Sequence, residues 1–417
     1  MKFKLSALAA ATATALSLAP MSHAGEVEVL HWWTSGGEAA SVQFLKQQLE
    51  SKGVTWTDFA VAGGGGESAM TVLKSRAISG NPPTAAQIKG PSIQEWGDLG
   101  FLASINDVAT QANWDDVLPA VVSDVMKHNG EYVAAPVNVH RVNWLWANPE
   151  VFRKAGATIP TTWDDFMVQA GKLKAAGYIP LAHGGQAWQD ATVFEAVVLG
   201  VGGAEYYQKA FVEGDMDMLN SDTTVKVFDV FGQLRQFIDA NSPGRDWNVA
   251  TSMVINGEAG MQIMGDWAKG EFKVAGKNAG TDFVCVAAPG TSGSFTFNVD
   301  SFAFFSQSDA DRSEAQGVMA DAILSTEFQE VFNLNKGSIP ARLGMDRSAF
   351  DSCAHDSMDA FVASSQTGGL VPSFAHGMAV SEAVAGAIYD TATNYFNSTD
   401  SAETGAQQLV AAISAAH

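Results

Sequence analysis

Strand-like and helix-like segments alternate along most of this chain, and this order constrains the fold more than any other feature. Residues 26–30 (EVEVL) alternate polar and apolar side chains, as a half-buried strand does. A helical pattern at 38–51, a strand-like segment at 55–61 and a helix from the four glycines at 63–66 to residue 78 follow. The last elements of this part are a strand at 84–88 and a helix at 92–99. Strands joined through helices pair in parallel, so the order predicts an α/β fold.

A second set of alternating elements follows residue 130. Strands are expected at 132–139, 142–147, 179–182, 259–264, 283–287 and 302–305. Helices are expected at 163–176, 190–201, 225–237, 315–324, 327–332, 378–394 and 401–416, and those at 190–201 and 225–237 read as amphipathic. A length of 417 residues gives two or three domains at roughly 150 residues each. No proline-rich linker separates them, and a chain that crosses between lobes more than once would explain this.

The first 24 residues are typical of a secretory signal. Lys2 and Lys4 precede an apolar stretch at 5–18, and small residues occupy the −3 and −1 positions of a cleavage site after Ala24. A membrane anchor is the alternative, but the apolar run is short for a span. No cysteine follows the cleavage point, so a lipid anchor is not supported. We therefore predict an exported protein.

The only two cysteines are Cys285 and Cys353. In an exported protein they either pair in a disulfide or remain two separate buried thiols. Two cysteines without histidines at ligand spacing do not predict a metal site.

Composition and missing motifs exclude several functions. The formal net charge of −21 argues against nucleic acid, whose phosphates require Lys and Arg, and against anionic lipid. The chain contains no G-x-x-x-x-G-K-[ST], G-x-S-x-G or H-E-x-x-H pattern, and no G-x-G-x-x-G after a strand. We expect no cofactor and no metal. A carboxylate pair for glycoside hydrolysis stays open, because 45 acidic residues offer many pairings.

Aromatic and polar residues gather where predicted strands end. Ligands of α/β sheets bind outside the carboxyl ends of strands. Trp32 and Trp33 follow the first strand, and a sugar ring would suit their flat faces, although only one of the pair is expected to face the site. Glu38, at a helix start, either accepts sugar hydroxyls or stabilises the helix dipole. Lys89 ends another strand and is a hydroxyl ligand or a solvated loop lysine.

Further candidates lie later in the chain. Trp267 follows the buried strand AGMQIM, and Asn298 and Asp300 share one face if the segment is extended. Lys336 precedes a turn, and His376 precedes a helix, although a lone histidine is more often structural. Mixed donors and acceptors are what polyol recognition needs, because each hydroxyl both donates and accepts.

Together and in order, these segments resemble the periplasmic sugar-binding proteins of ATP-binding-cassette (ABC) importers, the extracellular solute-binding family that includes maltose-binding protein. The segments that carry the resemblance are VLHWWTSGGE (29–38), GNPPTAAQIKG (80–90), YVAAPVNVHRVNWLWANPEVFRKAG (132–156), TTWDDF (161–166), GEAGMQIMGDW (257–267), the strand at 285–289 and FQEVFNLNKGSIPAR (328–342). The HWWTSGGE start, Lys89 and His376 look most like the glucose-binding branch of Gram-negative bacteria.

The resemblance implies two α/β lobes joined by a three-segment hinge, with the ligand cleft between them. We place the crossovers near 136–140, 298–302 and 338–342. The N-terminal lobe would comprise 25–137 with 303–340, and the C-terminal lobe 138–302 with 341–417. The expected ligand residues are Trp32, Trp33, Glu38, Lys89, Trp267, Asn298, Asp300, Lys336 and His376, together with Gln186 and Trp188 by analogy with binders of larger sugars and Arg141 as a weaker candidate.

The function that the resemblance implies is capture without chemistry. A monomeric periplasmic protein would bind a monosaccharide, with glucose favoured, and deliver it to an ABC permease in the inner membrane. The alternatives are an exported glycosidase and a binder of a larger oligosaccharide.

Overall fold

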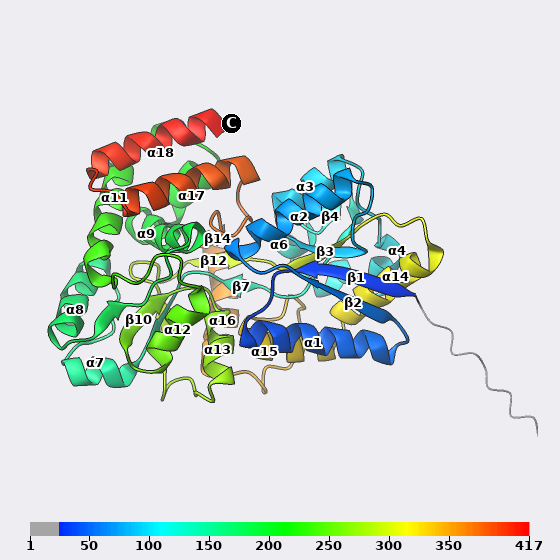
Figure 1. The fold of residues 1–417 in the computed structure, drawn as a ribbon, viewed down its shortest axis with the longest axis horizontal. Coiled ribbons are helices and arrows are strands. Elements are labelled where there is room, and N and C mark those ends of the chain that lie inside the picture. The colour runs from blue at the N-terminus through cyan, green and yellow to red at the C-terminus, as the bar shows by residue number, and fades with distance from the viewer. Residues whose placement is uncertain (1–24, 417) are drawn as a thin grey trace, which may run out of the picture.

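The computed structural model describes residues 25–416, so the predicted signal segment lies outside the described residues. Two α/β lobes lie side by side (Figure 1). The sheet of the first lobe has the strand order β2 (Thr55–Ala60), β1 (Glu26–His31), β3 (Ala85–Ile88), β13 (Ser301–Phe304) and β6 (Ala134–Pro136). β1 is parallel to β2 and β3, as the strand–helix order predicts, whereas β13 is antiparallel to both of its neighbours.

Helices cover this first sheet and bury one continuous apolar core. They are α1 (Gly36–Ser51), α2 (Glu67–Ile78), α3 (Pro91–Asp98), α4 (Asn106–Gln111), α5 (Trp114–Val117), α6 (Ala120–Ser123), α14 (Ala310–Ile323) and α15 (Thr326–Lys336). A small hairpin, β4 (Lys127–His128) with β5 (Glu131–Tyr132), and a 3₁₀ turn at Gly64–Gly66 complete the lobe.

The second lobe is built around a four-stranded sheet with the order β11 (Val284–Ala287), β8 (Trp144–Ala147), β10 (Ala259–Ile263) and β9 (Ile179–Leu181). Its helices are α7 (Pro149–Ala155), α8 (Trp163–Ala175), α9 (Ala187–Tyr207), α10 (Met216–Leu219), α11 (Asp222–Gln233), α12 (Trp247–Ile255), α13 (Ala268–Val274), α17 (Glu382–Phe396) and α18 (Ala402–Ala416). Thr162 caps α8 by accepting a hydrogen bond from the Asp165 N–H at 3.2 Å. Two apolar clusters form the core.

A third, small sheet lies between the lobes and consists of β14 (Leu370–Pro372), β12 (Phe295–Asn298) and β7 (His140–Arg141) (Figure 1). The chain crosses from one lobe to the other beside this sheet. The first and third crossovers pair through the backbones of Val139 and Ile339, and the Val137 N–H donates to the Asp300 carbonyl of the second at 2.9 Å. The lobe boundaries stay a prediction. In the structure the chain already enters the first sheet at Ser301.

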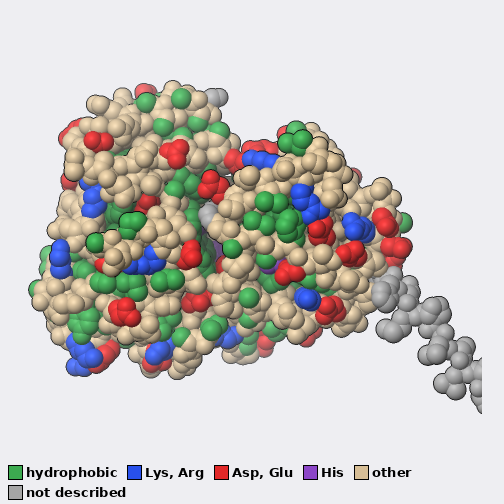
Figure 2. Space-filling view, viewed as in Figure 1, with side chains coloured by type: hydrophobic (Ala, Val, Ile, Leu, Met, Phe, Trp, Pro, Cys, Tyr) green, Lys and Arg blue, Asp and Glu red, His purple; other side chains and the backbone are tan. Residues whose placement is uncertain are grey.

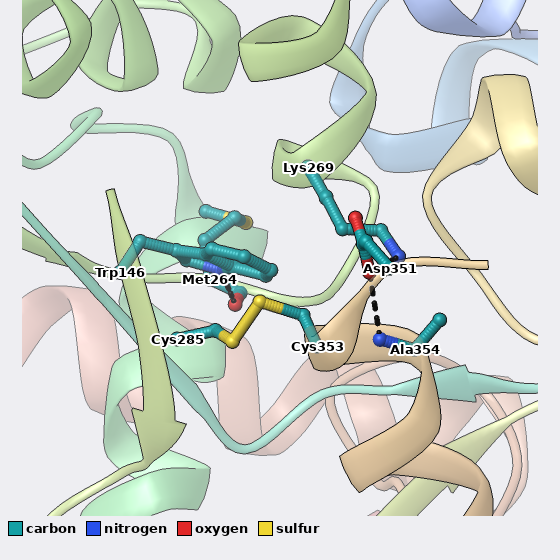
Figure 3. The surroundings of a disulfide bond; sticks show 7 residues. All are labelled: Trp146, Met264, Lys269, Cys285, Asp351, Cys353 and Ala354. Atoms are coloured by element: carbon teal, nitrogen blue, oxygen red, sulfur yellow. Dashed lines mark hydrogen bonds and ion pairs between the residues drawn. A yellow bond between two sulfur atoms is a disulfide. The ribbon is translucent and has the colours of Figure 1, made fainter. Parts of the chain in front are cut away.

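A disulfide joins Cys285 of β11 to Cys353 at the start of α16 (Ser352–Thr367), with the two Cα atoms 6.0 Å apart (Figure 3). It lies next to Trp146, whose indole N–H donates to the Met264 carbonyl at 2.8 Å. α16 packs on β12 and β14 of the central sheet. The disulfide therefore ties α16, which follows the third crossover, to the sheet of the second lobe.

Several local expectations were wrong. The predicted strand at 132–139 is not continuous, because this stretch leaves the hairpin at β5, joins the first sheet as β6 and then crosses over before β7. α9 is not amphipathic, since residues 188–199 are all buried and the helix packs against both α11 and α17. The helix expected from 378 is α17, which begins at Glu382. The sequence predicts no helix at the positions of α4, α5, α6, α7, α10, α12, α13 and α16.

Among residues 25–416, no helix combines the length and apolar character that crossing a bilayer requires.

Candidate functional site

A cavity of about 170 Å³ lies between the two lobes, beside the crossovers. At the surface, a notch separates the lobes (Figure 2). Eleven of the residues expected from the sequence line this cavity, namely Trp32, Trp33, Glu38, Lys89, Gln186, Trp188, Trp267, Asn298, Asp300, Lys336 and His376. They come from segments up to 344 residues apart, so the fold gathers them in one place. Arg141 does not line the cavity and instead places its guanidinium 4.2 Å from the centre of the Trp144 ring.

The two tryptophans after β1 both line the cavity, so the expectation that only one faces it was wrong. Trp33 is 2% exposed and packs edge-on against Phe302 and Phe332 of the core. Trp32 is half-buried and covers the glycine turn at Gly66. The chain bends after His31, which ends β1, so strict strand alternation no longer applies to this pair.

Glu38 stabilises the start of α1, which is one of the two roles that the sequence left open. As the third residue of α1 it accepts hydrogen bonds from the N–H groups of Thr34 and Ser35, which places its charge at the helix start. Its other carboxylate oxygen is 2.6 Å from the Lys336 ammonium, and both side chains are buried. This ion pair joins α1 to the end of α15 at the cavity wall.

Asp300 lies at the centre of a buried hydrogen-bond chain. It accepts from Gln87 and Asn138 at 3.3 Å and lies 2.9 Å from His140 Nε2. The other nitrogen of His140 contacts Asp266. Burial works against charge on both partners, but two flanking carboxylates raise the pKa of His140. Burial also opposes ionisation of Asp300, yet His140 holds its pKa well below the usual range.

Two polar groups of the cavity wall are left for a ligand. Lys89 extends over the face of Trp32, with its ammonium 5.2 Å from the ring centre. Burial lowers its pKa, and Asp300 offsets part of that effect from a distance. Asn298, at the end of β12, has a buried side-chain oxygen that finds no hydrogen-bond partner in the described part of the chain. Buried acceptors without partners are rare, so this oxygen marks a place where a ligand or water would donate.

The second lobe contributes an aromatic wall. The ring centre of His376 lies 4.8 Å from that of Trp267 and 6.0 Å from that of Trp188. His376 Nε2 is 3.0 Å from the Thr192 hydroxyl, and burial lowers the pKa of His376 well below its ordinary value. The imidazole is therefore neutral at neutral pH and presents one donor and one acceptor.

Gln186 lines the cavity, but its amide is already occupied. Its oxygen accepts from the Trp188 indole N–H at 2.8 Å, and its nitrogen donates to Asp246 at 2.7 Å. The structure thus shows Gln186 fixing the Trp188 ring.

Other lining residues were missed by the sequence reading, namely Thr34, Ser35, Ala62, Gly63, Gly65, His140, Asp246, Trp247 and Asn248. Asp246 directly precedes α12, and an acidic residue ahead of an apolar run is a helix-start signal that could have located the last three.

The lobes touch on several sides of the cavity. Gly65 of the first lobe packs on Trp188 of the second, where a Cβ would lie 3.1 Å from the indole Cγ. Gly90, which follows Lys89 and has φ +52°, comes so close to the Gly377 carbonyl that a Cβ would clash. The Gly37 N–H donates to Glu271 across the lobes at 3.1 Å. The structure therefore represents a closed arrangement in which both lobes enclose the cavity.

The family model of bacterial extracellular solute-binding proteins matches residues 33–320. This chain belongs to that family. The solute-binding protein is similar along its whole length to a "Probable sugar-binding periplasmic protein" of Brucella suis biovar 1 (strain 1330), with 49% identity over 417 residues that cover 99% of each chain. It is also 49% identical over 407 residues to a protein of the same name from Rhizobium meliloti (strain 1021), covering 97% of this chain and 98% of the relative.

A solved chitin oligosaccharide binding protein has the same fold. The TM-score is 0.80 at 17% identity, and the match covers 94% of this chain and 98% of the other. At this identity the likeness concerns the fold alone. Family membership and the architecture of two α/β lobes, both expected from the sequence, are confirmed.

Proposed function

We propose that this solute-binding protein captures one neutral monosaccharide, glucose in the first place, and delivers it to an ABC permease in the inner membrane. The observation that carries the proposal is the cavity itself. Aromatic rings from both lobes and free polar groups line one enclosed space of about 170 Å³. The apolar C–H faces of a sugar ring suit the aromatic walls, and its hydroxyl edge suits groups such as Lys89 and Asn298.

The charges around the cavity support a neutral ligand. The buried charges beside the cavity offset one another: Lys336 pairs with Glu38, and His140 contacts Asp266 and Asp300, the second of which also acts on Lys89. The other carboxylate of the wall, Asp246, is exposed. An anionic or cationic solute would leave one charge unbalanced in a buried space, which is costly.

The carboxylates also favour binding over hydrolysis. A glycosidase needs a carboxylic acid that is protonated near neutral pH. Asp300 has a pKa held well below its usual range, and Glu38 is paired with Lys336. The remaining acid on the wall, Asp246, is exposed and hydrogen-bonded to Gln186. The surroundings of Asp300 stabilise its ionised form, which cannot serve as the proton donor, and the Glu38 carboxylate is held by the Lys336 ammonium.

The names of the relatives support a sugar and an exported location. Cleavage after Ala24 would release the mature chain into the periplasm. An open form would bind the sugar to one lobe, and closure would add the contacts of the other, so that the ligand stabilises the closed state. The permease would then recognise the closed form.

Titration calorimetry with a panel of monosaccharides and short oligosaccharides tests the proposal. We expect glucose or another monosaccharide to bind with a Kd in the micromolar range or tighter, and to be recovered chemically unchanged. If every monosaccharide binds more weakly than about 1 mM, the monosaccharide proposal fails. Tighter binding of a trisaccharide than of any single sugar would favour the oligosaccharide alternative instead.

A matched pair of variants ties binding to this cavity. Lys89→Met removes the cation over Trp32, and Lys52→Met removes an exposed lysine that pairs with Asp321 at the surface. We expect Lys89→Met to weaken sugar binding at least tenfold, about 1.4 kcal/mol, and Lys52→Met to leave it unchanged. Equal affinities of the two variants would place the sugar elsewhere.

A further inference from the structure

One buried carboxylate lies outside the cavity and has no part in the binding described above. Glu195 is 1% exposed and lies in α9, directly before the apolar run AVVLGV at 196–201. None of its hydrogen-bond partners within residues 25–416 is a basic side chain. A buried carboxylate without a cation is costly unless its oxygens are well satisfied by other donors. Its partners therefore show what it holds in place.

All but one of those partners belong to the segment that leads to His376. The Ser373 hydroxyl donates to the carboxylate of Glu195 at 2.8 Å, and the Ala375 N–H donates at 3.0 Å. The remaining partner is the Tyr207 hydroxyl, at 2.7 Å, which also lies 2.8 Å from the Pro372 carbonyl and accepts from the Phe374 N–H at 3.1 Å. Hydrogen bonds from Glu195 and Tyr207 therefore fix the position of residues 372–375.

The same helix also shapes the cavity wall. Trp188, Thr192 and Glu195 are spaced by four and three residues, so they lie on one face of α9. Trp188 lines the cavity, Thr192 contacts His376 Nε2 at 3.0 Å, and Glu195 holds the backbone just before His376. On the opposite side, the Tyr389 hydroxyl of α17 donates to the Ala375 carbonyl at 2.7 Å. The position of the His376 imidazole therefore depends on hydrogen bonds to the backbone of Ala375 as well as on the contact between its ring and Thr192.

We propose that Glu195 is a positioning residue of the sugar site, whose ionised carboxylate fixes residues 373–375 and thereby sets the position of His376 against the ligand. This inference rests on the proposed function. An ionised acceptor makes hydrogen bonds roughly twice as strong as a neutral one. Protonation of Glu195 weakens its hydrogen bonds to Ser373 and Ala375. Fewer molecules then hold His376 in the binding position, and the apparent sugar affinity falls.

Because Glu195 is buried, its carboxyl gains and loses its proton near neutral pH. Burial raises the pKa of the Glu195 carboxyl to about 7, and the donors from Ala375, Tyr207 and Ser373 offset part of that effect. The other titratable groups that face Glu195 are the phenols of Tyr207 and Tyr389, whose pKa values burial raises above the ordinary range, so neither titrates near neutral pH. Because the ionised form binds sugar better, affinity rises as the pH rises through about 7.

The test measures the Kd for glucose between pH 6 and 8 for three proteins. They are the wild type, Glu195→Gln, and the matched control Glu205→Gln, which removes an exposed glutamate of the same helix. The wild type and Glu205→Gln are expected to bind about fivefold more weakly at pH 6 than at pH 8. Glu195→Gln is expected to bind at both pH values as the wild type does at pH 6. His140 has the same surroundings in all three proteins, so the difference between them reports Glu195 alone.

Two further variants keep the proposal falsifiable if Glu195→Gln does not fold. Ser373→Ala removes a donor to the charged carboxylate, so the midpoint of the pH profile should move to higher pH. His376→Ala should remove the pH dependence that depends on Glu195. An unchanged midpoint in Ser373→Ala, or a Glu195→Gln profile that matches the wild type, would overturn the proposal. Failure of the wild type to bind any sugar would instead refute the proposed function.

Discussion

The glycine turn against Trp32 offers a sharp test of how the first lobe shapes the cavity. Gly66 has φ +113°, and a Cβ there would lie 2.9, 3.0 and 3.1 Å from Cε2, Cζ2 and Cδ2 of the Trp32 indole. Carbon atoms in favourable contact stay about 3.5–4.0 Å apart, so Gly66→Ala forces the ring to move by about 0.5–1 Å. The ring carries Lys89 on its face, and its displacement therefore disturbs two cavity groups at once.

The expected cost in affinity follows from these contacts. A displaced cation–aromatic contact and a misplaced ring together remove about 1–2 kcal/mol of binding free energy, or about a tenfold increase in Kd. Gly80→Ala is the matched control, since Gly80 also has a positive φ, +72°, lies outside the cavity, and its Cβ would meet nothing within 4 Å. Both variants carry the same backbone strain, about 1–3 kcal/mol, and should lose similar amounts of stability.

Calorimetry with the bound sugar and thermal unfolding of both variants separate these effects. We expect Gly66→Ala to bind about ten times more weakly than Gly80→Ala at nearly equal melting temperatures. Equal affinities in the two variants would refute the argument, because they would mean that the position of Trp32 does not matter for binding.

Three further predictions follow from buried groups of the site. Asn298→Leu removes an acceptor that has no partner in the described residues, so sugar affinity should fall about tenfold in calorimetry while chemical denaturation shows unchanged or slightly higher stability. Lys336→Met leaves the Glu38 carboxylate buried without its cation and should lower the free energy of unfolding in urea by about 3–5 kcal/mol. Adding Glu38→Gln should restore part of this stability. Unchanged stability of the single variant would contradict the buried pair. The pKa of Asp300 is lowered in the folded protein, so its contribution to stability is complete above pH ~4 and is lost as the pH falls further; urea unfolding of Asp300→Asn should lack this acid-sensitive component, and an identical pH slope would contradict it.

Local patterns predicted the parallel part of the fold well. The alternation of EVEVL with a helical pattern placed β1 and α1, and the ends of strands located Trp32, Lys89 and Trp267 in one cavity. For Trp32 and Lys89 this worked because β1 and β3 are parallel neighbours whose carboxyl ends meet at one edge of a sheet. Trp267 follows β10 in the sheet of the other lobe, and it meets them only across the cavity. Gln186 and Trp188 could be named only through the family resemblance, since no strand end or turn pattern singles them out.

Long-range contacts set the limit of the sequence reading. Glu195 lies among apolar residues, and its partner Ser373 is 178 positions away, so no local sequence pattern predicts that the two residues interact. His140 was seen only as part of a crossover, because its role depends on Asp266 and Asp300 reaching it from both sides. Trp247 opens a helix whose apolar residues show no clear amphipathic period, which hid α12 and the part of the cavity wall it forms.

A crystal structure of the protein with the sugar that binds tightest in calorimetry tests the central claim most directly. The account predicts one sugar ring in the cavity between the lobes, in contact with Lys89 and Asn298 on one side and with Trp188 or His376 of the second lobe on the other. A sugar bound outside this cavity, or held by one lobe alone in a closed structure, would contradict it.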